Sequence, residues 1–202
     1  MAPPEPRTLR FGVVPGAMPG KWVERWRERM PHVTLEMIEI PVADQRRALA
    51  DEQVDVALVR EPFDRTDMHA VALYEEQAVV VMSVDSDLTV AETLDADDLA
   101  GEVLVIPGDD VLGDPRVPGT LEPAFPRIPD TEATIATVAT GVGITIVPMS
   151  LARLHHRKDV TFRPLTGGPV SPVLLAWLQR KDSEDIQAFV GITRGRTARS
   201  SR

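Results

Sequence analysis

Short apolar segments alternate with amphipathic ones through the first sixty residues, and this order restricts the fold more than any other feature. Runs typical of strands occupy residues 9–14, 33–40 and 54–60, the first of them a buried one, and a proline follows each closely. Between these runs, residues 17–30 and 44–50 have the spacing of helices, with Asp44 placed to cap the second. A strand–helix–strand–helix–strand order predicts a parallel α/β unit.

The chain changes character after a pair of strand-like segments at 70–74 and 77–84. Residues 85–131 are rich in acids, prolines and glycines around one strand-like run at 103–106. Regular elements then return, and a second α/β region is predicted. The remaining predicted elements are helices at 96–100, 131–140, 150–157 and 183–193, and strands at 143–148, 160–165 and 173–178.

Composition excludes several classes of function. The 202 residues are 43% hydrophobic, which is enough to bury a core, and they include no cysteine. Disulfides, thiol nucleophiles and cysteine-held metals are therefore excluded. The 31 acids outnumber the 22 lysines and arginines, giving a net charge of −9, so nucleic-acid binding by this chain is not expected. A start of MAPPEPRT lacks a secretion pattern, and no apolar run has membrane-spanning length, so a cytoplasmic location is predicted.

Four segments resemble the effector-binding domain of LysR-type transcriptional regulators. They are LRFGVVPGA (9–17), VDVALVREP (54–62), VALYEEQAVVVMSVDSDL (71–88) and TIATVATGVGITIVPMSLARL (134–154), of which the last is the most specific. The likeness extends over about residues 9–193. It implies an α/β, two-lobed periplasmic-binding-protein type 2 fold, in which two Rossmann-like lobes are joined by two crossover strands. The expected division is a disordered N-terminus (1–8), lobe I (9–84 plus 163–193), lobe II (85–162) and a basic disordered tail (194–202).

The resemblance also implies a function. Such a domain binds a small organic effector in the cleft between its lobes and dimerises through lobe I helices. Full-length members carry a winged helix-turn-helix ahead of this domain, whereas eight residues precede the first predicted strand here. A truncated regulator and a natural stand-alone domain both stay open. A solute-binding protein of a transport system is the main alternative, and an enzyme on the same fold is a weaker one.

The predicted site residues follow from the positions of strand ends. In open α/β sheets, ligands bind beyond the carboxyl ends of the strands, where helix amino ends attract anions. In the first lobe these positions are Gly16, Ala17, Met18, Val42, Ala43 and Arg60; in the second they are Gly108, Asp109, Asp130, Thr131, Gly141 and Gly143.

Arg60 is the most specific candidate among them. Its guanidinium can hold a carboxylate in a bidentate pair, or it can form a salt bridge with Asp44, Glu61 or Asp64. Relatives that bind small acids usually place hydroxyl side chains in the loops after the first two strands, but the loops here read PGAMPG and IPVADQ. The ligand is therefore predicted to be an acid with an aromatic or otherwise apolar part. No metal, cofactor or catalytic residue is predicted.

Three other motifs have simpler explanations than a site. His155 and His156 are adjacent on a helix and point about 100° apart, so they are interpreted as solvated residues at a helix end. The acid-rich run at 108–114 lacks a calcium-loop pattern, and the glycines at 141–143 precede a strand, which indicates a helix stop. The stripe formed by Trp22, Trp26 and Met30 is interpreted as core or as part of a subunit interface.

Overall fold

The computed structural model describes residues 7–195, and its contacts divide the chain into two compact units. Unit 1 consists of Met1–Tyr74 and Pro172–Arg202, and unit 2 of Glu75–Ser171. The chain passes from one unit to the other twice, within two long strands. The predicted disordered segments 1–8 and 194–202 lie mostly outside the described residues, but Arg7 and Thr8 already belong to the first strand.

Unit 1 contains a sheet whose first three strands are parallel, as predicted. Strand β1 pairs with β2 on one side and with β3 on the other, and β3 pairs with β7 in the antiparallel sense. The neighbour order of the strands is β2-β1-β3-β7-β4-β5, with β6 also paired to β4. The elements of this unit are β1 (Arg7–Val13), α1 (Gly20–Arg29), β2 (Val33–Glu39), η1 (Val42–Asp44), α2 (Gln45–Ala50), β3 (Val56–Arg60), the first part of β4 (Met68–Ser83), most of β7 (Val170–Leu178), η4 (Gln179–Lys181) and α5 (Glu184–Thr193).

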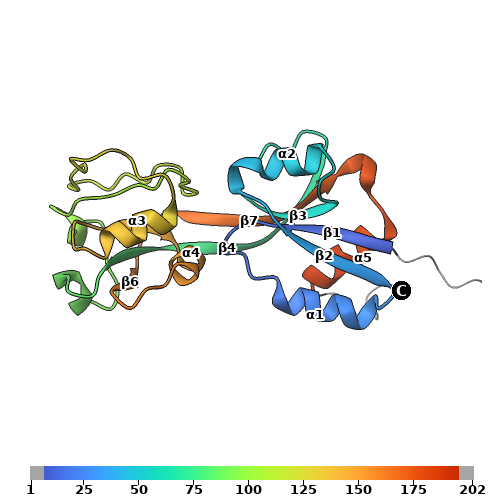
Figure 1. The fold of residues 1–202 in the computed structure, drawn as a ribbon, viewed down its shortest axis with the longest axis horizontal. Helices are drawn as coiled ribbons and strands as arrows, with labels where there is room; N and C mark the ends of the chain where they lie inside the picture. The colour runs from blue at the N-terminus through green and yellow to red at the C-terminus, as the bar shows by residue number, and fades with distance from the viewer. Residues whose placement is uncertain (1–6, 196–202) are drawn as a thin grey trace, which may run out of the picture. The chain divides into compact units, whose positions relative to one another are not determined.

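Helices cover both faces of this sheet (Figure 1). Helices α1 and α5 contact each other on one face, where the Phe189 ring lies 4.7 Å from that of Phe11 and 5.5 Å from that of Trp26. Helix α2 covers the other face through the buried side chains of Ala48 and Leu49. Trp26 is fully buried and its indole N–H donates to the Val33 carbonyl at 2.9 Å, so the core interpretation of this residue is confirmed.

Unit 2 is built around the second part of β4. Strands β5 (Thr145–Pro148) and β6 (Val160–Pro164) both pair with it in the antiparallel sense. One face of this sheet packs on the apolar loops, in a cluster that includes Leu104, Ile144 and Ile146. Because side chains alternate along a strand, Thr145 and Val147 face the opposite side, which α3 (Thr131–Val138) and α4 (Met149–Leu154) cover. The short helices η2 (Asp87–Val90) and η3 (Asp97–Leu99) lie in the loops.

Two predictions about strands differ from the structure. The two runs at 70–74 and 77–84 form one continuous strand, β4, because the charged residues between them still leave an extended, pairing backbone. The run at 103–106 forms isolated bridges to Leu121 and Ile144 instead of a full strand. The lobe boundaries differ too: residues 75–84 and 163–171 belong to unit 2, since β4 from position 78 onward pairs with strands of that unit.

Candidate functional site

Three loops meet at one edge of the sheet of unit 1. Strands β1, β2 and β3 are parallel, and Val13 pairs with Glu39 on one side and with Leu58 on the other. Their carboxyl ends therefore lie together, followed by the segments Gly16–Met18 and Val42–Ala43 and by Arg60. Ligands commonly bind at this edge of an α/β sheet. We call the side chains and backbone of these three segments the strand-end site.

The loop after β1 is a tight turn. The Ala17 N–H donates to the Val14 carbonyl at 3.2 Å, and Gly16 has φ of 80°, a conformation that residues with a β-carbon rarely adopt. Beyond the turn, the Met18 side chain is 73% exposed. A large apolar side chain left in solvent beside a strand-end loop is a surface that an apolar ligand can cover.

Helical structure begins directly after β2. The Asp44 N–H donates to the Pro41 carbonyl at 2.9 Å, which closes the short helix η1 ahead of α2. Val42 and Ala43 form the first helical residues, where N–H groups have no acceptor within the helix. The prediction that Asp44 caps the helix at 44–50 is wrong: its side chain makes no capping hydrogen bond to α2, and its carboxylate is paired with Arg47 at 2.7 Å.

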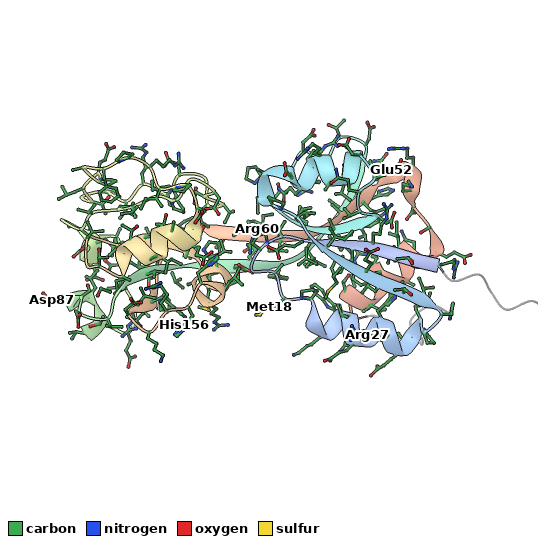
Figure 2. The ribbon with its side chains drawn as sticks, viewed as in Figure 1. Met18, Arg27, Glu52, Arg60, Asp87 and His156 are labelled. Carbon is green, nitrogen blue, oxygen red and sulfur yellow. The ribbon has the colours of Figure 1, made fainter. Side chains whose placement is uncertain are left out.

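Arg60 is enclosed under this site. Its side chain is fully buried, and Nη2 donates to the Pro15 carbonyl at 3.2 Å. The Arg60 backbone is held by the buried Gln45 side chain: Oε1 accepts from the Arg60 N–H and Nε2 donates to the Arg60 carbonyl, both at 2.8 Å. Arg60 thus ties the loop after β1 to the end of β3, and Gln45 ties α2 to the same point. Figure 2 shows Met18 and Arg60 at the same end of unit 1, opposite Glu52.

The three acids considered as partners of Arg60 each have another arginine. Asp44 is paired with Arg47, Asp64 lies 3.4 Å from Arg46, and Glu61 is paired with Arg65. The Gln45 contact was not predicted from the sequence. A buried glutamine at the first position of a short helix, 15 residues before an arginine at a strand end, gave no recognisable signal.

Unit 2 brings together three of its predicted residues. The Thr131 hydroxyl, which is buried, donates to the Asp109 carboxylate at 2.7 Å. Asp130 caps α3, and its carboxylate accepts from the Ala133 N–H at 2.7 Å. The backbone of Gly108 nearby cannot take a side chain, because a β-carbon there would lie 2.3 Å from the Pro129 carbonyl oxygen. Two of the protein's own carboxylates therefore occupy the positive end of α3, which leaves little attraction there for an anionic ligand.

Gly141 and Gly143 lie at the other end of unit 2. Leu104 pairs with Ile144 in the parallel sense. The two glycines, which come just before Ile144, therefore lie beside the beginning of run 103–106, whereas Asp109 comes after the end of that run. Gly143 approaches Val103 so closely that a β-carbon would lie 2.2 Å from the Val103 carbonyl oxygen. The two glycines are thus a helix stop and a close backbone approach, as the motif predicted, and their assignment to the same edge as Asp109 is wrong.

Two other polar side chains, those of Ser150 and Glu76, meet at the edge that holds Asp109. Strand β5 ends there at Pro148, and the Ser150 hydroxyl donates to the Glu76 carboxylate at 2.5 Å. The sequence carried a usable signal for Ser150, since a hydroxyl residue two positions after a strand-ending proline belongs to the carboxyl edge.

Neither the histidines nor the acidic loop forms a metal site. Residues 7–195 contain no cluster of three or more potential ligands placed to hold a metal ion. His155 ends α4, and His156 is exposed beside a groove of about 560 Å³ in unit 2. Asp110 accepts from the Leu112 N–H at 3.0 Å and from the Asp114 N–H at 2.6 Å, so this loop is closed by its own backbone. No helix within the described residues 7–195 has the length and apolar character needed to cross a bilayer.

Comparison with known proteins identifies the family. The sequence matches the family described as LysR substrate binding domain over residues 4–198. The chain belongs to the LysR substrate-binding domain family. Among curated relatives, it is 27% identical to the Hca operon transcriptional activator HcaR of Escherichia coli (strain K12), over 96% of this chain and 69% of HcaR. It is 28% identical to the HTH-type transcriptional regulator CatR of Pseudomonas putida, over 83% of this chain and 61% of CatR.

Solved structures of LysR-type regulators share the fold. The BenM effector-binding domain with its effector benzoate aligns with a TM-score of 0.72 at 19% identity, covering 96% of this chain and 93% of that domain. The reduced OxyR regulatory domain from Pseudomonas aeruginosa aligns with a TM-score of 0.70 at 21% identity, covering 94% of this chain and 96% of that domain. The predicted fold, two-lobed and of the periplasmic-binding-protein type 2 class, is therefore confirmed, and the chain is a LysR effector-binding domain.

Proposed function

We propose that this LysR domain binds a small carboxylic acid with an aromatic or otherwise apolar part at the strand-end site of unit 1, and that it acts by binding and not by catalysis. The convergence of three strand ends on this edge is the observation that carries the proposal. Relatives of the chain are transcriptional regulators, and one similar domain has benzoate as its effector. The expectation of a cleft between the lobes stays a prediction.

The chemistry of the site favours this ligand class. Met18 offers exposed apolar surface, and Val42 and Ala43 add side chains without hydroxyl or charge. The polar groups that remain are backbone N–H groups at the start of a helical segment, which favour an anion. Arg60 lies beneath the loop after β1, so we assign it a positioning role: its bond to Pro15 fixes the loop that receives the ligand.

A pair of charge insertions tests the location of the site. Ala43→Asp adds a carboxylate to the strand-end site, whereas Gln53→Asp adds the same charge at an exposed turn after α2. Calorimetry with benzoate, phenylacetate and citrate should show binding of the aromatic acids, about tenfold weaker in A43D and unchanged in Q53D. Binding of citrate alone, or equal effects of both variants, would contradict the proposal.

We also propose that the domain forms a homodimer through α1 and β2 of unit 1. Strand β2 stands at the end of the strand order, and Met37 on it is 54% exposed. Helix α1 carries both signs of charge at four exposed residues, Lys21, Glu24, Arg25 and Glu28. An apolar strand surface next to mixed charges suits a two-fold contact, in which each surface meets a copy of itself.

A further inference from the structure

A pocket that none of the predicted site residues lines lies within unit 2. It has a volume of about 410 Å³, in the range of pockets that hold small organic molecules. It is formed entirely by residues of the long segment between β4 and α3, drawn yellow-green in Figure 1.

A proline explains why space opens at this place. The Leu121 N–H donates to the Glu102 carbonyl and the Leu104 N–H to the Leu121 carbonyl, both in a short parallel ladder. The next donor toward the Leu104 carbonyl would be residue 123, but Pro123 has no N–H. The ladder therefore stops, and the chain from Pro123 onward separates from residues 104–106. Among the described residues, the Ile106 N–H has no backbone acceptor.

The walls of the pocket are mainly apolar. Leu104 and Val105 line it and are buried, and Leu121, with 54% of its surface exposed, lines it as well. Phe125 is half-buried and adds a flat aromatic surface. Walls of this kind favour a ligand with an aromatic body, because ring contacts add to the burial of apolar area.

The two arginines of the pocket differ in their charge environment. Arg116 lies 3.1 Å from the Asp114 carboxylate and 3.4 Å from that of Glu122, so two acids already neutralise its charge. Arg127 donates from Nη2 to the Pro107 carbonyl at 2.9 Å, which holds the guanidinium at the pocket. Within residues 7–195, no carboxylate is within ion-pair distance of Arg127. A guanidinium held in place beside apolar walls is a site for one carboxylate.

We propose that this pocket binds a small aromatic monocarboxylate, with the ring against Phe125 and the carboxylate on Arg127. The site belongs to unit 2 and shares no residue with the strand-end site of unit 1. A second ligand site of this kind would let the domain respond to two compounds, or to two concentrations of one compound.

Binding of 4-trifluoromethylbenzoate, followed by fluorine NMR and by backbone amide shifts, tests the proposal. The amides of residues 104–106 and those of Phe125 and Arg127 should shift in the unmodified chain. Arg127→Gln should weaken this binding about tenfold, whereas Arg127→Lys, which keeps the charge, should retain most of it. Arg157→Gln, at an exposed arginine of unit 2 that does not line this pocket, is the matched control and should change the affinity by less than about twofold.

The neutral analogue 4-trifluoromethylbenzamide supplies a second comparison, and it should bind about tenfold more weakly than the acid. Amide shifts confined to residues 16–18 and 42–43 would overturn the pocket proposal while supporting the strand-end site. Equal losses in R127Q and R157Q, or no shift of residues 104–106 at millimolar acid, would overturn it as well. Shifts at the pocket without any at the strand-end site would support the pocket and count against the proposed function.

Discussion

The side-chain amide of Gln45 forms two hydrogen bonds with the backbone of Arg60, one as acceptor and one as donor, each at 2.8 Å. The Gln45 side chain takes the place of a neighbouring strand at the buried end of β3, because it pairs with both the N–H and the carbonyl of Arg60. Arg60 in turn reaches the Pro15 carbonyl. This chain of contacts fixes the loop after β1 relative to β3 and α2, so the strand-end site is formed before any ligand arrives.

Replacing Gln45 with methionine should destabilise the protein by about 2–4 kcal/mol. Methionine has a similar length but cannot pair with the Arg60 N–H and carbonyl, and each buried group left without a partner costs about 1–3 kcal/mol. Urea unfolding measures the change. Arg47→Ala, on the exposed side of the same helix, should cost less than about 1 kcal/mol. A Q45M protein as stable as the parent would show that the amide does not support Arg60.

Thr145 offers the opposite case, a buried group without a partner. Its side chain is fully buried in β5, and among the described residues its hydroxyl has no hydrogen-bond partner. Thr145→Val should raise the free energy of unfolding by about 1 kcal/mol, since the valine keeps the shape and removes the unsatisfied hydroxyl.

Thr134 is the matched control for that substitution. It is equally buried, but its hydroxyl donates to the Asp130 carbonyl at 2.8 Å. Thr134→Val should therefore lower the free energy of unfolding by about 1 kcal/mol. A thermal unfolding series that gives both substitutions the same sign would contradict the assignment.

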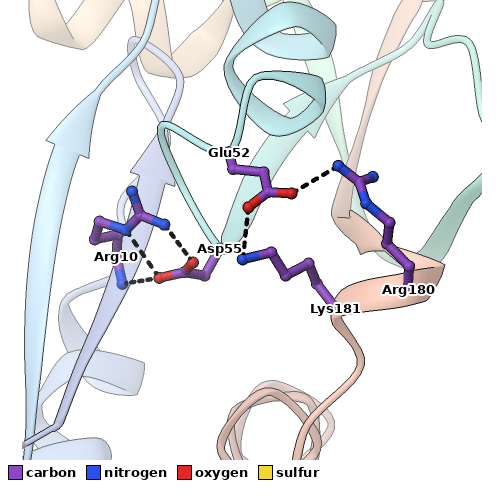
Figure 3. Close-up of polar contacts among 5 residues, drawn as sticks. All are labelled: Arg10, Glu52, Asp55, Arg180 and Lys181. Carbon is purple, nitrogen blue, oxygen red and sulfur yellow. Dashed lines mark hydrogen bonds and ion pairs between the residues drawn. The ribbon is translucent and has the colours of Figure 1, made fainter.

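An ion-pair network lies at the end of unit 1 away from the strand-end site (Figure 3). The Arg10 backbone N–H and Nε donate to one oxygen of Asp55 at 2.9 and 3.1 Å, and Nη2 donates to the other at 2.6 Å. Beside it, Glu52 accepts from both Arg180 and Lys181 at 2.7 Å. Burial would raise the pKa of Asp55, but the bonds from Arg10 and the charges of Arg10 and Lys181 together outweigh it, so this pKa is lowered.

Acid should therefore destabilise the protein partly through Asp55. Because its pKa is lower in the folded chain than the unfolded value of about 4, the stabilisation is fully present above pH 4. It is lost as the pH falls through the folded pKa. Asp55→Asn and Arg10→Gln should each reduce stability at pH 7 by about 1–3 kcal/mol and flatten its decline below pH 4. Urea unfolding between pH 7 and pH 2.5 measures this decline. If stability fell with pH in both variants as it does in the parent, this role of Asp55 would be ruled out.

The dimer proposal is tested at Met37, because Trp26 is buried and a charge there would unfold the core. Met37→Asp should convert the dimer to a monomer, as measured by light scattering after size exclusion. Val90→Asp makes a comparable change from an apolar residue to an acid at a side chain 89% exposed in unit 2, and it should leave the mass unchanged. A dimer that persists in M37D would place the interface elsewhere.

The sequence predicted the parallel strands of unit 1 well, because each apolar run had a length and a closing proline that match one strand. The helix predicted at 183–193 forms as α5 with Ser183 at its N-cap, and the Ser183 hydroxyl accepts from the Ile186 N–H as a capping side chain does. Strand β4 was divided in two because its middle residues are exposed, and exposure alone does not end an extended backbone. The residues at which strands begin and end depend on hydrogen bonding with neighbouring strands, and a single sequence does not reveal those neighbours.

The site was predicted less completely than the fold. Strand-end positions could be named from the order of elements, and six of them converge in unit 1. Gly141 and Gly143 were misplaced because the direction of run 103–106 relative to β5 could not be read from composition. The burial of Arg60 and its Gln45 partner depend on packing between segments 15 and 45 residues apart, for which the sequence offers no periodic signal.

Amide chemical shifts during titration with benzoate measure the central claim most directly. We predict saturable shifts of Gly16, Ala17, Met18, Val42 and Ala43, about tenfold weaker binding in A43D, and the same pattern with phenylacetate. A folded protein in which neither acid moves these five amides at millimolar concentration would contradict the assignment of the effector site to the strand ends of unit 1.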